Sequence, residues 1–144
     1  MDIYALIEAD HRVVEELFAK LEEAQNPRGR ERLFEQLKAE LLRHKEVEER
    51  TFYAALSTLP EISDLIEEAM EEHVDAEELL QELDGLDAEE DEWVATLQEL
   101  REEIEHHVTE EEGEIFAKAK KLLSAEQAKK LAKEFSAEKE RVAF

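Results

Sequence analysis

Long uninterrupted runs of helix-forming residues constrain this chain more than any other feature. Apart from a lone Gly113, glycine and proline occur in only three places, within residues 26–29, 59–60 and 84–85. Between these breaks, apolar residues recur every three or four positions, which is the period of an amphipathic helix. Ser124 and Gln127 form a capping-box pattern that marks the start of one more helix. We therefore predict helices over residues 2–25, 30–58, 61–83, 88–121 and 125–141.

The connections between the first four predicted helices are short, which makes consecutive helices antiparallel neighbours. Each helix carries an apolar stripe that has to face inward; in the first helix it runs through Ile3, Ile7 and Val14. The sequence therefore predicts an all-α fold, an up-down-up-down four-helix bundle over residues 1–121 with a short fifth helix. Residues 122–144 are predicted to form this C-terminal amphipathic helix, packed on the bundle or extending from it.

Histidine and glutamate interrupt the apolar stripes at positions that should face the core. In the second helix the stripe steps from Leu41 to His44, Glu48 and Phe52, and the other helices contain similar steps. A buried imidazole or carboxylate without a partner is costly, so such residues on four helices need a common explanation. A metal ion supplies one, because it binds several of these groups at once. The inward-facing candidate ligands are His11, His44, Glu48, His73, Glu77, His107 and Glu111.

The helical phase of these residues is stronger evidence than their spacing. The chain has 41 acidic residues among 144, and each of its five histidines has a glutamate four positions later. On a helix surface such a pair is an ordinary ionic contact, which is the alternative for any single pair. His106 lies about 100° around the helix from His107, so we expect it on the flank of the bundle.

Residue counts from the connecting turns group the candidates by height. A helix rises about 1.5 Å per residue, so a four-residue step is about 6 Å, a distance that suits two metals bridged by carboxylates. The two layers predicted in this way are His11, His44 and Glu77, followed by Glu48 and His73. His107 lies farther from its turn than His73 does. Either an irregular connection over residues 84–92 or a fourth helix that projects past the third has to absorb this difference.

The ordered motifs resemble those of the hemerythrin-like (HHE cation-binding) domain family over roughly residues 5–120. The motifs are Asp10-His11, His44-x3-Glu48-Glu49, Glu72-His73 and His107-x3-Glu111-Glu112. They are most similar to the bacterial H–HxxxE–H–HxxxE subgroup. The resemblance implies a non-haem di-iron centre inside the bundle, in which Glu48 and Glu111 bridge the irons. The ligands that it implies are His11, His44, Glu48, His73, His107 and Glu111.

The chain departs from the oxygen-carrying hemerythrins, which have a further histidine where Glu77 stands and end the last motif in aspartate. Glu77 is therefore expected to be a ligand or a base behind the ligands. Some members of the subgroup have a tyrosine proposed as an iron ligand where Tyr53 stands, five residues after Glu48. Five residues turn an α-helix by about 500°, so Tyr53 should point about 140° away from Glu48. It reaches the metal only through a local bulge or an asymmetric approach of the helices, and is otherwise a buried or interfacial tyrosine.

Carboxylate in place of imidazole favours Fe(III) over Fe(II), because an anionic oxygen is the harder donor. We therefore expect two iron ions, oxo- or hydroxo-bridged and carboxylate-bridged, that decompose peroxide in a catalase-like way or react with O2. Manganese is the other metal that these ligands would accept. The expected partners are small molecules: peroxide, O2 or NO. The alternatives are iron binding without turnover, for sensing, storage or donation, and a metal-free structural bundle.

Composition limits the other classes of function. A formal charge of −23 repels phosphate and anionic lipid, so we expect neither nucleic-acid binding nor membrane binding. The chain has no cysteine, which excludes disulfides and thiolate metal sites. It also has no long apolar run and no basic-then-apolar start, and we therefore expect a soluble, cytoplasmic protein. The sequence indicates no particular protein partner.

Overall fold

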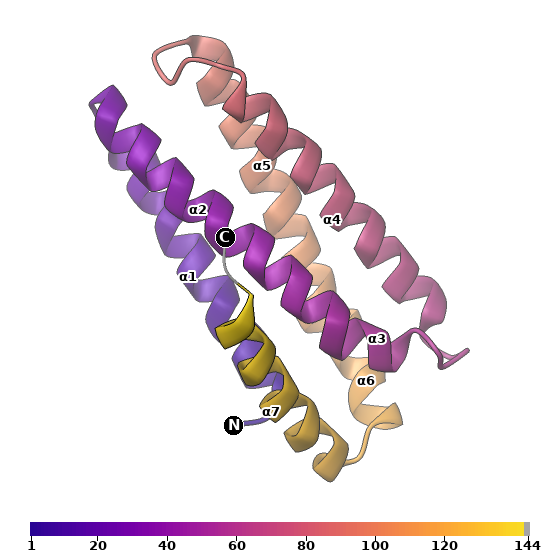
Figure 1. The fold of residues 1–144 in the computed structure, drawn as a ribbon. Coiled ribbons are helices and arrows are strands. Elements are labelled where there is room, and N and C mark those ends of the chain that lie inside the picture. Colours follow the sequence, from indigo (N-terminus) through magenta and orange to yellow (C-terminus); the bar gives the residue numbers. More distant parts are fainter. Residues whose placement is uncertain (143–144) are drawn as a thin grey trace.

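The helices of the computed structural model, which describes residues 1–142, run up and down in two antiparallel pairs (Figure 1). The first pair is α1 (Ile3–Glu23) and α2 (Pro27–Glu48), and the second is α4 (Ser63–Asp84) and α5 (Asp91–Glu110). A π-helical turn, η1 (Glu49–Tyr53), continues α2 into α3 (Ala54–Leu56), and a second, η2 (Glu111–Ile115), continues α5 into α6 (Phe116–Leu122). The last helix, α7 (Ala125–Arg141), returns along α1 and α2. The predicted all-α up-down-up-down bundle with a fifth helix is confirmed.

Capping side chains set the ends of several helices. The Asn26 side chain accepts a hydrogen bond from the Gly29 N–H at 2.6 Å, and Pro27 occupies the first turn. Proline is favourable there because that turn needs no N–H from it. The second helix therefore begins at Pro27, and the predicted start at residue 30 was wrong. Ser124 and Gln127 exchange the two hydrogen bonds of a capping box, and α7 spans the predicted residues 125–141.

An irregular segment over residues 85–90 joins α4 to α5. Ala88 is buried within it, and its carbonyl accepts a hydrogen bond from Arg30 Nη1 at 3.0 Å. This anchored segment delays the start of α5 to Asp91, so the predicted start at residue 88 was wrong. It is the irregular connection that the sequence left open as one way for His73 and His107 to meet.

Two apolar clusters fill the bundle, one on each side of a polar layer. One cluster lies toward the α4–α5 connection and includes Leu21, Leu37, Leu83, Trp93 and Leu100. The other lies toward α3 and α6 and includes Ile3, Phe52, Leu56, Ile66 and Phe116. The layer between them contains the inward-facing histidines and glutamates. None of the helices within residues 1–142 is long and apolar enough to cross a membrane.

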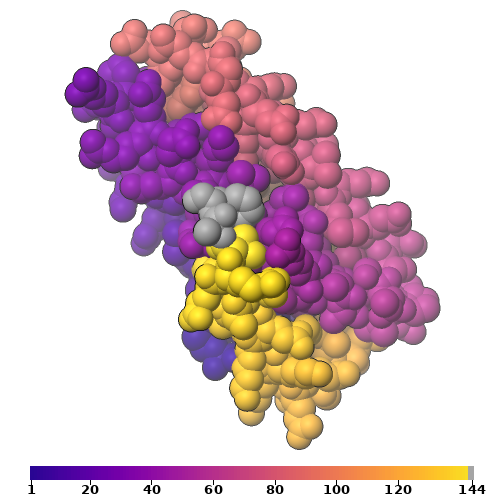
Figure 2. Space-filling model, in the orientation of Figure 1, coloured from indigo at the N-terminus to yellow at the C-terminus, as the bar shows by residue number. Residues whose placement is uncertain are grey.

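The C-terminal helix α7 packs on the outside of the first helix pair. It contributes Ala128, Leu131 and Phe135 to the second apolar cluster, and it contacts α1, α2 and η1. Figure 2 shows α7, in yellow, lying on the surface beside α2. Its exposed face carries Lys129, Lys130 and Lys133, so its apolar face is the one that is buried.

Leu37→Ala should lower the free energy of unfolding by about 2–5 kcal/mol, because Leu37 is fully buried and its truncation leaves a cavity. Urea unfolding followed by circular dichroism measures this change. Val94→Ala on exposed α5 surface is the matched control and should change it by no more than about 0.5 kcal/mol. Equal effects of the two substitutions would contradict the placement of Leu37.

Candidate metal centre

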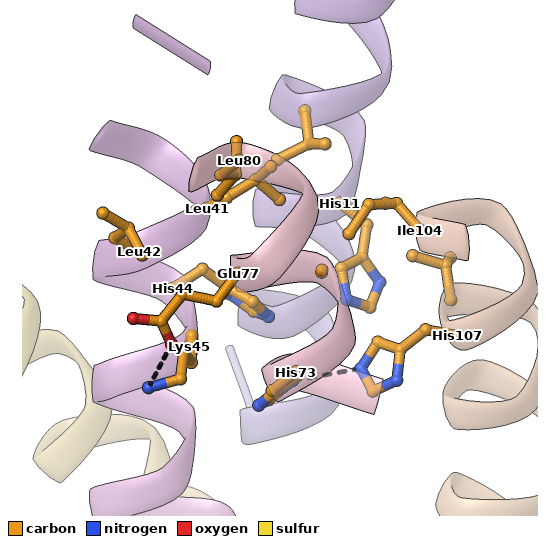
Figure 3. A pocket seen from close by; sticks show the side chains of 13 residues that line it. His11, Leu41, Leu42, His44, Lys45, His73, Glu77, Leu80, Ile104 and His107 are labelled. Atoms are coloured by element: carbon orange, nitrogen blue, oxygen red, sulfur yellow. Dashed lines mark hydrogen bonds and ion pairs between the residues drawn. The ribbon is translucent and has the colours of Figure 1, made fainter. Parts of the chain in front are cut away.

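Four buried histidines, one from each long helix, meet halfway along the bundle. They are His11 of α1, His44 of α2, His73 of α4 and His107 of α5. Figure 3 shows the four rings around one cavity, and the Nε2 atoms of His73 and His107 lie 3.2 Å apart. The inward stripes therefore bring all four imidazoles to one cavity.

The imidazoles and two glutamates form two groups that could each hold a metal ion. Within each group the potential ligand atoms lie within 4.8 Å of one another. The first group, here called the His11–His44 position, is His11, His44, Glu48 and Glu111. The second, the His73–His107 position, is Glu48, His73 and His107.

Each of the two glutamates reaches both positions. Glu48 Oε1 lies 3.5 Å from His44 Nε2 and 3.3 Å from His73 Nε2. Glu111 Oε1 lies 3.1 Å from His11 Nε2, and its Oε2 lies 3.8 Å from His107 Nε2. Both carboxylates are fully buried. This is the placement that a carboxylate needs to bridge two metal ions.

Several buried atoms of this cluster have no hydrogen-bond partner within residues 1–142. They are His11 Nε2, His44 Nε2, both carboxylate oxygens of Glu48 and Glu111 Oε1. An unsatisfied buried polar group costs about 1–3 kcal/mol, and more when it is charged. Metal ions at the two positions would satisfy these atoms together. The imidazole and carboxylate donors therefore fit a pair of iron or manganese ions.

A second set of carboxylates holds the far side of each imidazole. The four Nδ1–carboxylate contacts are His11 to Glu112 at 2.7 Å, His44 to Asp10 at 2.7 Å, His73 to Glu49 at 2.7 Å and His107 to Glu72 at 2.8 Å. An Nδ1–H that donates to a carboxylate leaves Nε2 free for a metal and fixes the ring orientation. These four acids lie within the motifs of the sequence, but no contact with the imidazoles was predicted for them.

A simple signal could have found them, because each lies next to a candidate ligand in the sequence. Asp10 precedes His11 and Glu72 precedes His73, while Glu49 and Glu112 follow the two buried glutamates. One residue turns a helix by about 100°, which directs the neighbour of an inward ligand toward the adjacent helix. The carboxylate of this neighbour then contacts the Nδ1 atom of the imidazole on the adjacent helix.

Protons balance the buried charges of this cluster when metal is not bound. Burial opposes the charged form of His73, but the nearby carboxylates of Glu48 and Glu49 raise its pKa to about 9. Burial also opposes the charged form of Glu48, yet the charges of His44 and His73 hold the pKa of this carboxyl well below its usual range. A metal ion that binds here therefore displaces protons from the imidazoles.

Tyr53 reaches the cluster because η1 changes the phase of the second helix. Its hydroxyl donates a hydrogen bond to Glu111 Oε2 and lies 3.5 Å from His107 Nε2, while its ring stacks on His73. A π-helical turn closes i→i+5 hydrogen bonds, so a residue five positions after Glu48 returns to the same side. This is the local bulge that the sequence required for Tyr53 to reach the centre, and the side chain is fully buried.

The structure does not bring Glu77 into either of the two buried groups of ligand atoms, nor into a third, partly exposed group of Glu72, His106 and Glu110 found in the described chain. Its carboxylate instead lies 3.5 Å from Lys45 Nζ, between α4 and α2 (Figure 3). His106 is exposed on the flank, 3.3 Å from Glu110 and 3.5 Å from Glu72. The centre is thus built from His11, His44, Glu48, His73, His107 and Glu111, with Tyr53 in contact.

A small cavity adjoins the four imidazoles. Its volume is about 40 Å³, and besides the imidazoles it is lined by apolar side chains, among them Leu41, Leu80 and Ile104, and by the Lys45–Glu77 pair (Figure 3). A cavity of this size has room for a molecule of a few atoms. The centre is therefore accessible to a small ligand from the apolar side.

Comparison with known proteins agrees with this geometry. Residues 2–119 match the profile of the family described as Hemerythrin HHE cation binding domain. The chain belongs to this family. The histidine and glutamate groups are therefore the part of this HHE domain that is able to bind metal ions. The match ends before α7, which lies outside it.

A crystal structure and one curated protein extend the comparison. The crystal structure is of a hemerythrin HHE cation binding domain-containing protein from Mycobacterium kansasii. It shares the fold, with a TM-score of 0.86 and 24% identity over 98% of this chain and 86% of that chain. A DNA nickase from Nostoc is 28% identical over 142 residues, which are 99% of this chain and 40% of the nickase. The chain thus spans less than half the length of that relative.

Removal of bound metal should lower the melting temperature by roughly 5–10 °C. Metal at a hundredfold excess over its dissociation constant adds about 2.7 kcal/mol of stability, and the chain loses this on chelation. Calorimetric scans of iron-loaded protein, before and after dialysis against a chelator, measure the shift. Identical melting temperatures would mean that the buried carboxylates do not bind metal.

Glu77→Gln should leave the bound metal content unchanged, because the carboxylate of Glu77 pairs with Lys45 away from the ligand atoms. His73→Gln should lower it by about one ion per chain, because it removes a ligand of the His73–His107 position. Elemental analysis of the two purified variants beside the unmodified chain provides the comparison. A loss of metal in the Glu77 variant would return this residue to the ligand set.

Proposed function

We propose that this domain holds two iron ions among its four central histidines and uses them to decompose hydrogen peroxide. The observation that carries the proposal is the pair of ligand groups that share Glu48 and adjoin a small apolar cavity. Iron supplies the change between Fe(II) and Fe(III) that converts two molecules of peroxide into two of water and one of O2.

The protein residues would position this pair of ions and set its charge. Glu48 and Glu111 reach both positions, so they would hold the two ions at a fixed separation. The four imidazoles are each fixed from behind by a carboxylate, which makes them stronger donors. This strongly anionic surrounding favours the ferric state, and so supports redox turnover over reversible O2 carriage.

Tyr53 would supply a further oxygen to the His73–His107 position. Its hydroxyl contacts Glu111 and lies near His107, so it faces this position and not the other. Burial, together with the negative charges of Glu111 and Glu48, raises the pKa of Tyr53 well above its ordinary value. The phenol therefore keeps its proton in the chain without metal, and as a ligand it would supply an anionic oxygen, a donor that favours Fe(III).

The cavity supports a substrate of a few atoms. Leu41, Leu80 and Ile104 give it an apolar wall, while His11, His44, His73 and His107 line its other side. A small neutral molecule such as peroxide or O2 enters such a space at lower cost than an anion does.

The activity named for the Nostoc relative, DNA nicking, is not part of this proposal. The match covers 40% of the DNA nickase, and the present chain has a formal charge of −23, which repels a DNA backbone. No group of the described centre is arranged around a phosphate site. We therefore propose no action on nucleic acid.

Iron loading of the metal-free chain should saturate at two ions, and the loaded protein should release O2 from peroxide faster than free iron does. Elemental analysis and an oxygen electrode measure the two quantities. His44→Gln should abolish the turnover, whereas Val94→Ala should preserve it. Saturation at two irons without turnover would favour the alternative of iron binding for sensing, storage or donation. Absence of binding would leave a structural bundle, and activity only with manganese would change the metal.

Tyr53→Phe should remove the visible absorption band of a phenolate bound to Fe(III), while the chain still binds two irons. Tyr4→Phe is the matched control, because Tyr4 is the other tyrosine of the chain and lies buried in the apolar cluster near Phe52. Absorption spectra of the iron-loaded variants provide the measurement. A band that persists in the Tyr53 variant, or disappears in the Tyr4 variant, would contradict the assignment.

A further inference from the structure

The four carboxylates that contact the Nδ1 atoms differ in whether they also form an ion pair with a lysine or arginine. At the His11–His44 position, both of these carboxylates form such an ion pair. Asp10, which accepts from His44, also forms an ion pair with Lys139 of α7. Glu112, which contacts His11, forms an ion pair with Arg12 at 3.0 Å. Two side-chain cations therefore stand behind this position.

The His73–His107 position has no such cations within residues 1–142. Glu49 contacts His73, and neither it nor Glu72 forms an ion pair with lysine or arginine in that part of the chain. Glu72 instead lies beside His106 and Glu110. The Tyr53 hydroxyl faces the same position. The lysine and arginine pairs therefore stand behind the His11–His44 position alone in the described chain.

A carboxylate strengthens an imidazole ligand by accepting its Nδ1 proton more strongly. A lysine or arginine on that carboxylate withdraws part of its negative charge, so the imidazole becomes a weaker donor. The same cation also repels the metal ion, an effect that is screened less when the pair is buried. Asp10 is 3% exposed and the Lys139 side chain 33%, so this pair is partly shielded from solvent.

We propose that Lys139 and Arg12 make the two metal positions unequal, so that the His73–His107 position fills first and the His11–His44 position holds its ion more weakly. The proposal rests on the two-ion centre proposed above. Lys139 and Arg12 are positioning residues, since they act through Asp10 and Glu112. Neither reaches the metal-facing side of the imidazoles.

The C-terminal helix becomes part of the centre through this contact, although it lies outside the family match. Phe135 of α7 packs its ring against His44, with 6.1 Å between the ring centroids. Arg50 and Glu138 form an ion pair at 3.4 Å that holds α7 beside α2 and η1. These contacts seat Lys139 on Asp10. The last helix therefore lowers the metal affinity of the His11–His44 position without contacting the metal.

Titration of the metal-free full chain with cobalt(II), followed by calorimetry and visible absorption, tests the proposal. Cobalt(II) is stable toward oxidation under these conditions, so affinity is measured without turnover. We expect two steps that differ by about tenfold or more in affinity. His44→Gln should remove the weaker step and His107→Gln the tighter one.

Lys139→Gln and Arg12→Gln should each raise the cobalt affinity of the weaker step several-fold, which reduces the difference in affinity between the two steps. Lys133→Gln, at an exposed site on the same helix, should leave both steps unchanged. Arg12 lies on α1, so its variant tests the charge effect even if the Lys139 variant loosens α7. Two equal steps, or steps that neither substitution changes, would overturn this inference alone. Saturation at one cobalt per chain would overturn the two-ion centre as well.

Discussion

The charge balance of the polar layer halfway along the bundle determines most of this structure. Glu48 and Glu111 are fully buried there, and only opposite charge or metal makes such burial tolerable. The four histidines face these carboxylates because they occupy core positions of the helical repeat. The second set of acids then fixes the histidines, and the helices have to be in register for all these contacts to form together.

The two halves of the bundle reach this arrangement by the same means. An acid-histidine pair on one helix faces a His-x3-Glu-Glu motif on the next, first in α1 and α2 and then in α4 and α5. A π-helical turn begins just after Glu48 in the first half and at Glu111 in the second. The halves differ at the position five residues on, which is Tyr53 after Glu48 and Phe116 after Glu111. The two halves therefore have similar backbones, but only the first places a hydroxyl group at this position.

Helical period predicted the fold and most of the centre, because a stripe fixes which residues face inward. The helical period locates an inward residue only to within about one turn, and this is why it wrongly grouped Glu77 with the ligands. That residue shares the approximate phase of His73, but its carboxylate lies with Lys45. Tyr53 required a π-helical turn, and no pattern in residues 49–53 distinguishes that turn from an α-helix. Lys139 meets Asp10 from 129 residues away, a contact that depends on how α7 docks. Local sequence carries no information on such a contact.

The polar layer also divides the hydrophobic core into two clusters with different helix ends. Apolar packing alone couples residues within each cluster more strongly than it couples one cluster to the other. The cooperativity of unfolding between the two ends of the bundle therefore passes through the imidazoles and carboxylates. A metal ion bound in this layer would connect two potential folding units, and the chain without metal would allow the two ends to open more independently.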